Sequence, residues 1–302
     1  MSETIKSYFE NAQLSQAAYA FLNKELMSTP SDFIDALRVD NNFSEAQATQ
    51  FVNQYSIIHD QQNTPNGFSA TLFKDQSDVY TLAIRGTEPT SFTDIVLTDF
   101  GDIGGDGIAL KQAVDLFNYY QKLTTDINSQ AMQLEPYEGI FAPPAGTPVQ
   151  VISTGNGPAA LPRYRYLKVI DSVDGLGEIP PDAKINVTGH SLGGHLALIL
   201  ARLDPNHINE VYTYNAPGFD TGLIGSNDTE WFFGAIKTLQ QQEEGLSTVI
   251  ESGWPEDKLN NLVIPLDVVS DIKETFSNSI KLLKRNVCVL VLSYPPSVLK
   301  AL

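Results

Sequence analysis

The stretch from residue 184 to residue 214 constrains the fold of this chain most. Residues 184–188 (Lys-Ile-Asn-Val-Thr) and residues 210–214 (Glu-Val-Tyr-Thr-Tyr) have the composition of strands, and residues 195–202 are apolar enough to form a buried helix. The turn Gly-His-Ser-Leu-Gly at 189–193 joins the first strand to the helix. Strand, helix and strand at this spacing predict a βαβ unit, and therefore a largely parallel sheet.

The rest of the chain supplies further elements around this unit. Residues 138–163 are rich in Pro and Gly with few charges, and we interpret them as a long loop of the kind that often serves as a lid. Apolar spacing and β-branched runs predict helices over residues 1–55, paired strands at 68–73 and 79–84, a helix at 108–123 and a strand at 261–264. The sequence pattern therefore predicts an α/β protein.

The turn at 189–193 has the form Gly-x-Ser-x-Gly, which indicates a nucleophilic serine. A serine hydroxyl is a poor nucleophile until a base takes its proton. Between a strand and a helix this turn holds the hydroxyl exposed on a strained bend, where bulky neighbours would clash. The helix N-terminus adds positive partial charge beside it. We therefore expect Ser191 to be a nucleophile.

A second motif, Arg-Gly-Thr at residues 85–87, ends the strand predicted at 79–84. Ligands of open α/β sheets bind at the carboxyl ends of the strands. A backbone N–H from this turn, together with the N–H of Leu192, would supply the two donors of an oxyanion hole. The alternative interpretation is an ordinary strand-to-loop turn.

Three runs together resemble the class 3 lipases: Ala-Ile-Arg-Gly-Thr-Glu at 83–88, Thr-Gly-His-Ser-Leu-Gly-Gly-His-Leu-Ala at 188–197, and Tyr-Thr-Tyr-Asn-Ala-Pro-Gly-Phe at 212–219. They are most similar to the bacterial branch whose longer members, lipases and phospholipases, carry repeats-in-toxin tails. The resemblance covers roughly residues 10–272. It implies an α/β-hydrolase-like domain with a mostly parallel sheet flanked by helices.

The resemblance also implies a function and a set of site residues. The expected reaction is hydrolysis of triacylglycerol or phospholipid esters through an acyl-enzyme on Ser191. Thr87 and Leu192 match the oxyanion-hole residues. Asp267 matches the acid of the catalytic triad, with Asp271 as the reserve choice.

The triad base is missing from the expected place. Triads of this fold run in the order Ser, Asp, His, and the sequence has no histidine after Asp267. We expect structural or surface roles for the four histidines, which are His59, His190, His195 and His207. An alternative function is therefore a catalytically impaired hydrolase-fold protein that binds lipid or acyl ligands.

The last thirty residues differ in charge from the rest. Residues 1–272 carry 14 basic and 35 acidic residues, whereas residues 273–302 carry 5 basic and 1 acidic. We divide the chain into a lipase-like domain at 1–272 and an atypical basic tail at 273–302, which also holds the single cysteine, Cys288. A truncated or frameshifted end and an ordinary strand with a basic helix end are equally consistent with this change.

The composition of the chain limits which partners and cofactors it is expected to bind. A net charge of −17 opposes nucleic-acid binding. One cysteine, and histidines without metal-ligand spacing, support no metal-centred mechanism. We expect no required cofactor. Calcium is an alternative at Asp99, Asp102 and Asp106, although their spacing lacks the signature of a calcium loop.

The expected substrate, a lipid or small ester, raises the question of membrane contact. Residues 230–236 (Glu-Trp-Phe-Phe-Gly-Ala-Ile) form an aromatic patch that suits either a lid touching a lipid surface or core packing. The N-terminus lacks the pattern of a signal peptide, and no long apolar run predicts a membrane span. We expect a protein that is cytoplasmic or secreted by a signal-peptide-independent route. The oligomeric state stays open.

Overall fold

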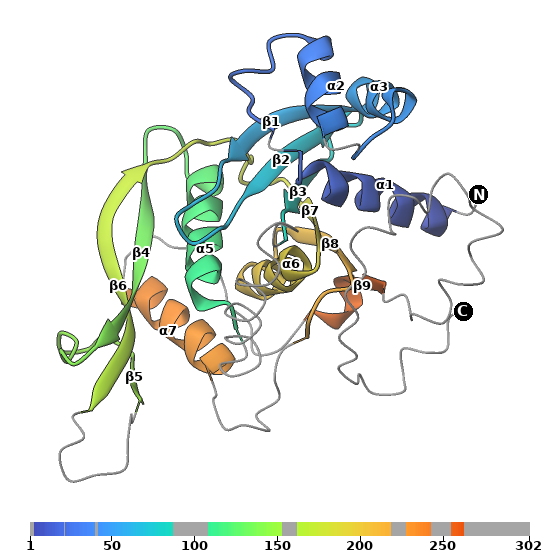
Figure 1. The fold of residues 1–302 in the computed structure, drawn as a ribbon. Helices are drawn as coiled ribbons and strands as arrows, with labels where there is room; N and C mark the ends of the chain where they lie inside the picture. The colour runs from blue at the N-terminus through green and yellow to red at the C-terminus, as the bar shows by residue number, and fades with distance from the viewer. Residues whose placement is uncertain are drawn as a thin grey trace.

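The computed structural model describes residues 3–20, 22–39, 42–86, 108–152, 162–218, 228–242 and 255–262. Two sheets and their flanking helices make up this part of the chain (Figure 1). The helices are α1 (Glu3–Ala17), α2 (Pro30–Arg38), α3 (Glu45–Gln54), α5 (Leu110–Thr124), α6 (Leu192–Leu203), α7 (Asp228–Gln242) and the short 3-10 helix η3 (Glu256–Lys258).

The larger sheet contains six of the described strands, in the spatial order β1, β2, β3, β7, β8, β9. They are β1 (Tyr55–Gln61), β2 (Ala70–Asp75), β3 (Tyr80–Ile84), β7 (Ile185–His190), β8 (Ile208–Tyr214) and β9 (Leu259–Leu262). Only β2 runs against the others, because it pairs antiparallel with both β1 and β3 while β3, β7, β8 and β9 are mutually parallel. The predicted βαβ unit and mostly parallel sheet are confirmed.

Side chains alternate between two helical layers along the sheet. Leu72 and Leu82 pack in one core with α5, α6 and α7, whereas Phe73 and Ala83 pack in another with α1, α2 and α3. Successive residues of a strand point to opposite faces, so both faces of this sheet are covered. The helices expected over residues 1–55 and 108–123 are confirmed, whereas β1 was not predicted.

The smaller sheet places a short strand, β5 (Val149–Ile152), inside the long loop expected at residues 138–163, and residues 153–161 of that range lie outside the described residues. Strands β4 (Gln130–Gly139), β5 and β6 (Arg163–Asp174) form an antiparallel sheet in the order β4, β6, β5. Tyr137 stacks on Tyr166 with ring centroids 4.7 Å apart. This cross-strand contact joins β4 to β6.

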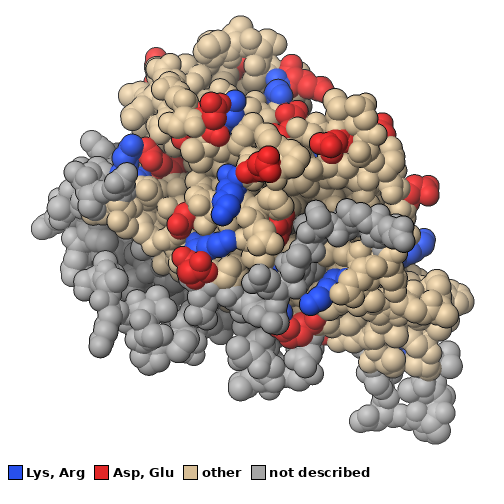
Figure 2. All heavy atoms as spheres, turned by 180° about the vertical axis from the view of Figure 1, so that it is seen from behind, with Lys and Arg blue, Asp and Glu red and all other residues tan. Residues whose placement is uncertain are grey.

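On the described part of the face in Figure 2, acidic and basic side chains lie next to one another. Among the described residues, no helix is long and apolar enough to cross a membrane. The same part of the chain holds no group of three or more His, Cys, Asp or Glu side chains that would bind a metal ion. The acidic residues proposed for calcium, and the basic tail at 273–302, lie outside the described residues.

Candidate active site

Ser191 occupies the sharp turn between β7 and α6. Its φ is 55° and its ψ is −126°, a backbone conformation that non-glycine residues rarely adopt. The turn is held by hydrogen bonds: the Ser191 N–H donates to the Tyr214 carbonyl at 2.9 Å, and the Ser191 carbonyl accepts from the N–H of Gly194 at 3.0 Å. The sequence pattern Gly-x-Ser-x-Gly thus folds as the strained strand-to-helix elbow that presents a serine hydroxyl.

The glycines on either side of Ser191 are needed for close backbone packing. A Cβ on Gly189 would lie 2.3 Å from the backbone of Gly193, and a Cβ on Gly193 would lie 2.2 Å from the Ile84 carbonyl oxygen. Such distances are far below van der Waals contact. The elbow therefore presses directly against the end of β3, which only glycine permits.

The Arg-Gly motif at the end of β3 lies beside the serine. A Cβ on Gly86 would stand 3.4 Å from Ser191 Cβ and 2.5 Å from the His190 carbonyl oxygen. Leu192 is the first residue of α6, where backbone N–H groups have no partner within the helix. Thr87 lies outside the described residues. The donors proposed for an oxyanion hole thus come from segments that meet at Ser191, and the role of each stays a prediction.

His195 lies beneath the elbow and is fully buried. Its Nδ1 lies 3.3 Å from the Pro217 carbonyl oxygen. Because a carbonyl only accepts, Nδ1 carries the proton and donates. Burial lowers the pKa of His195 to about 4, so the ring is neutral at pH 7 and serves the packing of the elbow.

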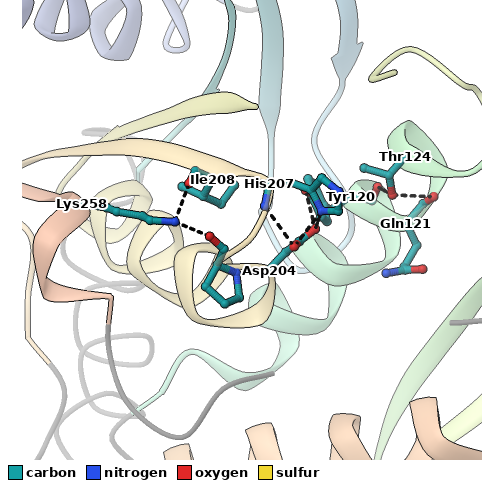
Figure 3. A network of polar contacts seen from close by, with 8 residues as sticks. Tyr120, Gln121, Thr124, Asp204, His207, Ile208 and Lys258 are labelled. Carbon is teal, nitrogen blue, oxygen red and sulfur yellow. Dashed lines mark hydrogen bonds and ion pairs between the residues drawn. The ribbon is translucent and has the colours of Figure 1, made fainter. Parts of the chain in front are cut away.

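His207 forms a polar network at the opposite edge of the sheet (Figure 3). Its Nδ1 lies 2.8 Å from Asp204 Oδ2, and the buried Asp204 also accepts a hydrogen bond from Tyr120 Oη at 2.9 Å. The His207 carbonyl accepts from the N–H of Ile185, at the start of β7. Ser191 follows the end of that strand, which at 3.3 Å per residue places it roughly 20 Å away.

His59 is equally remote from the serine. It lies on β1, three strands from β7, a distance of about 14 Å at 4.8 Å per strand. Its Nδ1 lies 3.0 Å from Tyr119 Oη. The structural roles expected for His59, His195 and His207 agree with these contacts.

His190, the neighbour of Ser191, contacts a residue that sequence reasoning missed. Its Nδ1 lies 3.1 Å from the hydroxyl of Tyr19, which follows α1. Burial lowers the pKa of His190 to about 4. In the sequence, Tyr19 is only an aromatic residue in an Ala-rich helix end, and nothing local signals a contact 171 positions later.

The triad acid is not placed, since Asp267 and Asp271 lie outside the described residues. The strand before them, β9, runs parallel to β8. Its carboxyl end therefore faces the same edge of the sheet as Ser191. Asp267 follows the end of β9 by five residues, and its role as triad acid stays a prediction.

The aromatic patch at residues 230–236 belongs to the core. Phe232 and Phe233 of α7 are buried in the larger hydrophobic cluster, and their rings pack edge to face at 5.4 Å. Of the two interpretations of this patch, the structure supports core packing over a lipid-facing lid.

Together, the sheet order, the two helical layers and the elbow at the end of β7 define an α/β-hydrolase fold. Residues 81–218 match the family model of lipase (class 3). This match supports the resemblance of residues 81–218 to the class 3 lipases, and with it a lipase-like hydrolase of lipid esters. Comparisons with curated proteins and with solved structures gave no match. The finer resemblance to the bacterial branch with repeats-in-toxin tails stays a prediction.

Proposed function

We propose that this protein hydrolyses carboxylic esters of lipids, triacylglycerol or phospholipid, through an acyl-enzyme on Ser191. The observation that carries the proposal is the positive φ of Ser191 at a turn packed against Gly86. Ser191 is partly exposed. A strained serine at the N-terminus of a helix suits acyl transfer, because such an elbow presents the hydroxyl and the helix end offers backbone N–H donors.

The proposed reaction has two steps. Ser191 Oγ attacks the ester carbonyl and loses its proton to a base, while the N–H groups of Leu192 and Thr87 stabilise the tetrahedral oxyanion. The alcohol leaves with a proton, and the acyl group stays on Ser191. Water then attacks the acyl-enzyme, which releases the fatty acid and restores the hydroxyl.

The base is the open part of this mechanism and favours a second candidate. His59 and His207 are too far from Ser191, and the Nδ1 atoms of His190 and His195 are engaged by Tyr19 and by the Pro217 carbonyl. The sequence has no histidine after Asp267. A site that lacks one triad member retains only about 10³–10⁴-fold catalysis over water. The second candidate is therefore a hydrolase-fold protein that binds lipid or acyl ligands without turnover.

Hydrolysis of nitrophenyl butyrate by wild type and by Ser191→Ala distinguishes the two. We expect wild type to release nitrophenol and Ser191→Ala to lose at least 10³-fold in kcat while remaining folded. A folded wild type without turnover that binds a fluorescent fatty acid would support the second candidate. Equal rates for both proteins would contradict the role of Ser191.

A further inference from the structure

The backbone ladder between β3 and β7 ends before it reaches the proposed oxyanion hole. The last paired residues are Ile84 and Gly189. The proposed donors lie further along each strand, after Gly86 on one side and after His190 on the other. Their separation must therefore be set by something other than the sheet.

The hydroxyl of Tyr19 lies where the ladder stops. It accepts a hydrogen bond from the Gly86 N–H and lies 3.1 Å from His190 Nδ1. A Cβ on Gly86 would stand only 2.4 Å from this hydroxyl oxygen. One oxygen atom therefore touches both strand ends at the elbow.

The protonation states of the two side chains agree with this bridge. Burial raises the pKa of Tyr19, although the Gly86 N–H and the charge of Arg85 oppose the shift, so the hydroxyl keeps its proton. Burial lowers the pKa of His190, so its ring is neutral near pH 7. The hydroxyl can then accept from Gly86 and donate to Nδ1 at the same time.

Helix α1 fixes the place of Tyr19 through contacts with the sheet. Thr188 Oγ1 of β7 donates to the Asn11 carbonyl at 3.0 Å, and Tyr214 Oη of β8 donates to the Tyr8 carbonyl at 2.5 Å. These bonds tie α1 along two parallel strands. The residue that follows the helix is thereby held at the elbow.

We propose that Tyr19 is a positioning residue of the ester-hydrolysing site, whose hydroxyl joins Gly86 to His190 and holds the two sources of oxyanion-hole donors at a fixed separation. The inference rests on the proposed function of Ser191. It assigns to Tyr19 no contact with the substrate.

Tyr19→Phe tests this role, because it keeps the ring and removes only the hydroxyl. Removal of a whole oxyanion donor costs about 10²–10³-fold in kcat, so misplacement of the donors should cost about 10–100-fold. We expect that loss in kcat for nitrophenyl butyrate with KM changed less than about twofold. The rate at which a fluorophosphonate probe labels Ser191 should fall by the same factor.

Tyr119→Phe is the matched control, since it also removes a buried tyrosine hydroxyl that contacts a histidine Nδ1, that of His59, three strands away from the elbow. We expect it to lower the thermal midpoint about as much as Tyr19→Phe and to leave kcat within about twofold. A second measurement needs no variant: ¹⁵N spectra of wild-type histidines should show Nδ1 of His190 without a proton at pH 7.

The outcomes separate the inference from the proposed function. An active wild type with unchanged kcat in Tyr19→Phe, an equal kcat loss in Tyr119→Phe, or a protonated His190 Nδ1 would each overturn the role of Tyr19 alone. A folded wild type with neither turnover nor labelling would overturn the proposed function and the inference with it.

Discussion

Ser191 has a backbone conformation that costs of order 1–3 kcal/mol for a residue with a side chain. It persists because its surroundings determine it on every side: its N–H is bonded to Tyr214, its carbonyl caps α6, and glycines stand at the two closest backbone approaches. The Gly-x-Ser-x-Gly pattern of the elbow could be recognised in the sequence, because close backbone packing requires glycine there. The contacts of the elbow with β3 and Tyr19 could not be predicted, because they involve segments far away in the sequence.

Gly193→Ala should disrupt the elbow. Its new Cβ would meet the Ile84 carbonyl oxygen at 2.2 Å, and backbone on both sides leaves no flexible side chain to yield. We expect the free energy of unfolding to fall by about 2 kcal/mol, together with loss of ester hydrolysis. Denaturant unfolding of Gly234→Ala is the control: Gly234 lies in α7 with open space at its Cβ, so this change should raise stability by about 0.5–1 kcal/mol. A Gly193→Ala protein as stable as wild type would contradict the packing described for the elbow.

His195 should make stability fall as the pH falls. Its folded pKa of about 4 is below the ordinary value of 6.5, so between these pH values the unfolded chain takes up a proton that the folded protein does not. The stabilising share of neutral His195 is thus present above pH 6.5 and is lost toward pH 4.

His195→Asn keeps a donor for Pro217 and does not titrate. The difference in unfolding free energy between wild type and this variant should shrink by about 2 kcal/mol from pH 7 to pH 5. Urea unfolding at both pH values measures it. A difference that does not change with pH would show that His195 is not held neutral by burial.

At the scale of elements, a buried ion pair attaches the smaller sheet to α7. Asp228, the first residue of α7, is 2% exposed and pairs with Arg165 of β6, while Gln150 of β5 donates to the same carboxylate. Arg165 also lies 3.4 Å from Glu138 of β4. Three strands and a helix therefore share one charged cluster.

This cluster explains why the smaller sheet was missed. Its strands are interrupted by a connection rich in Pro and Gly, and β5 has only four residues. Its charged residues, Arg163, Arg165 and Glu138, suggest loops when taken one by one. By contrast, the predicted bounds of β2, β3, β7 and β8 agree with the observed bounds to within a few residues, since these strands are buried apolar runs bounded by turns. Periodicity detects strands that bury apolar side chains, and the smaller sheet depends in part on paired charges.

Asp228→Asn should weaken this attachment. Removal of one partner of a buried pair typically costs about 3 kcal/mol, since the other charge stays desolvated. Glu135→Gln is the control, because the pair of Glu135 with Lys168 is exposed and 3.9 Å long, and its loss should change stability by less than about 0.5 kcal/mol. Denaturant unfolding compares the two, and equal small effects would contradict the importance of the cluster.

At the scale of the whole molecule, the fold class and the family followed from the strand–turn–helix pattern and three short motifs. The join between α1 and the elbow and the second sheet did not, because they depend on contacts between segments far apart in the chain. The split at residue 272 and the acid Asp267 stay predictions. Among the described residues on the face in Figure 2, acidic and basic side chains lie next to one another.

The central claim is that the fold activates Ser191. The most direct test is mass spectrometry of the intact protein and of its peptides after exposure to a fluorophosphonate probe. We expect one adduct per chain, located on Ser191, and none on Ser191→Ala. An unlabelled but folded wild-type protein, or an adduct on another residue, would contradict it.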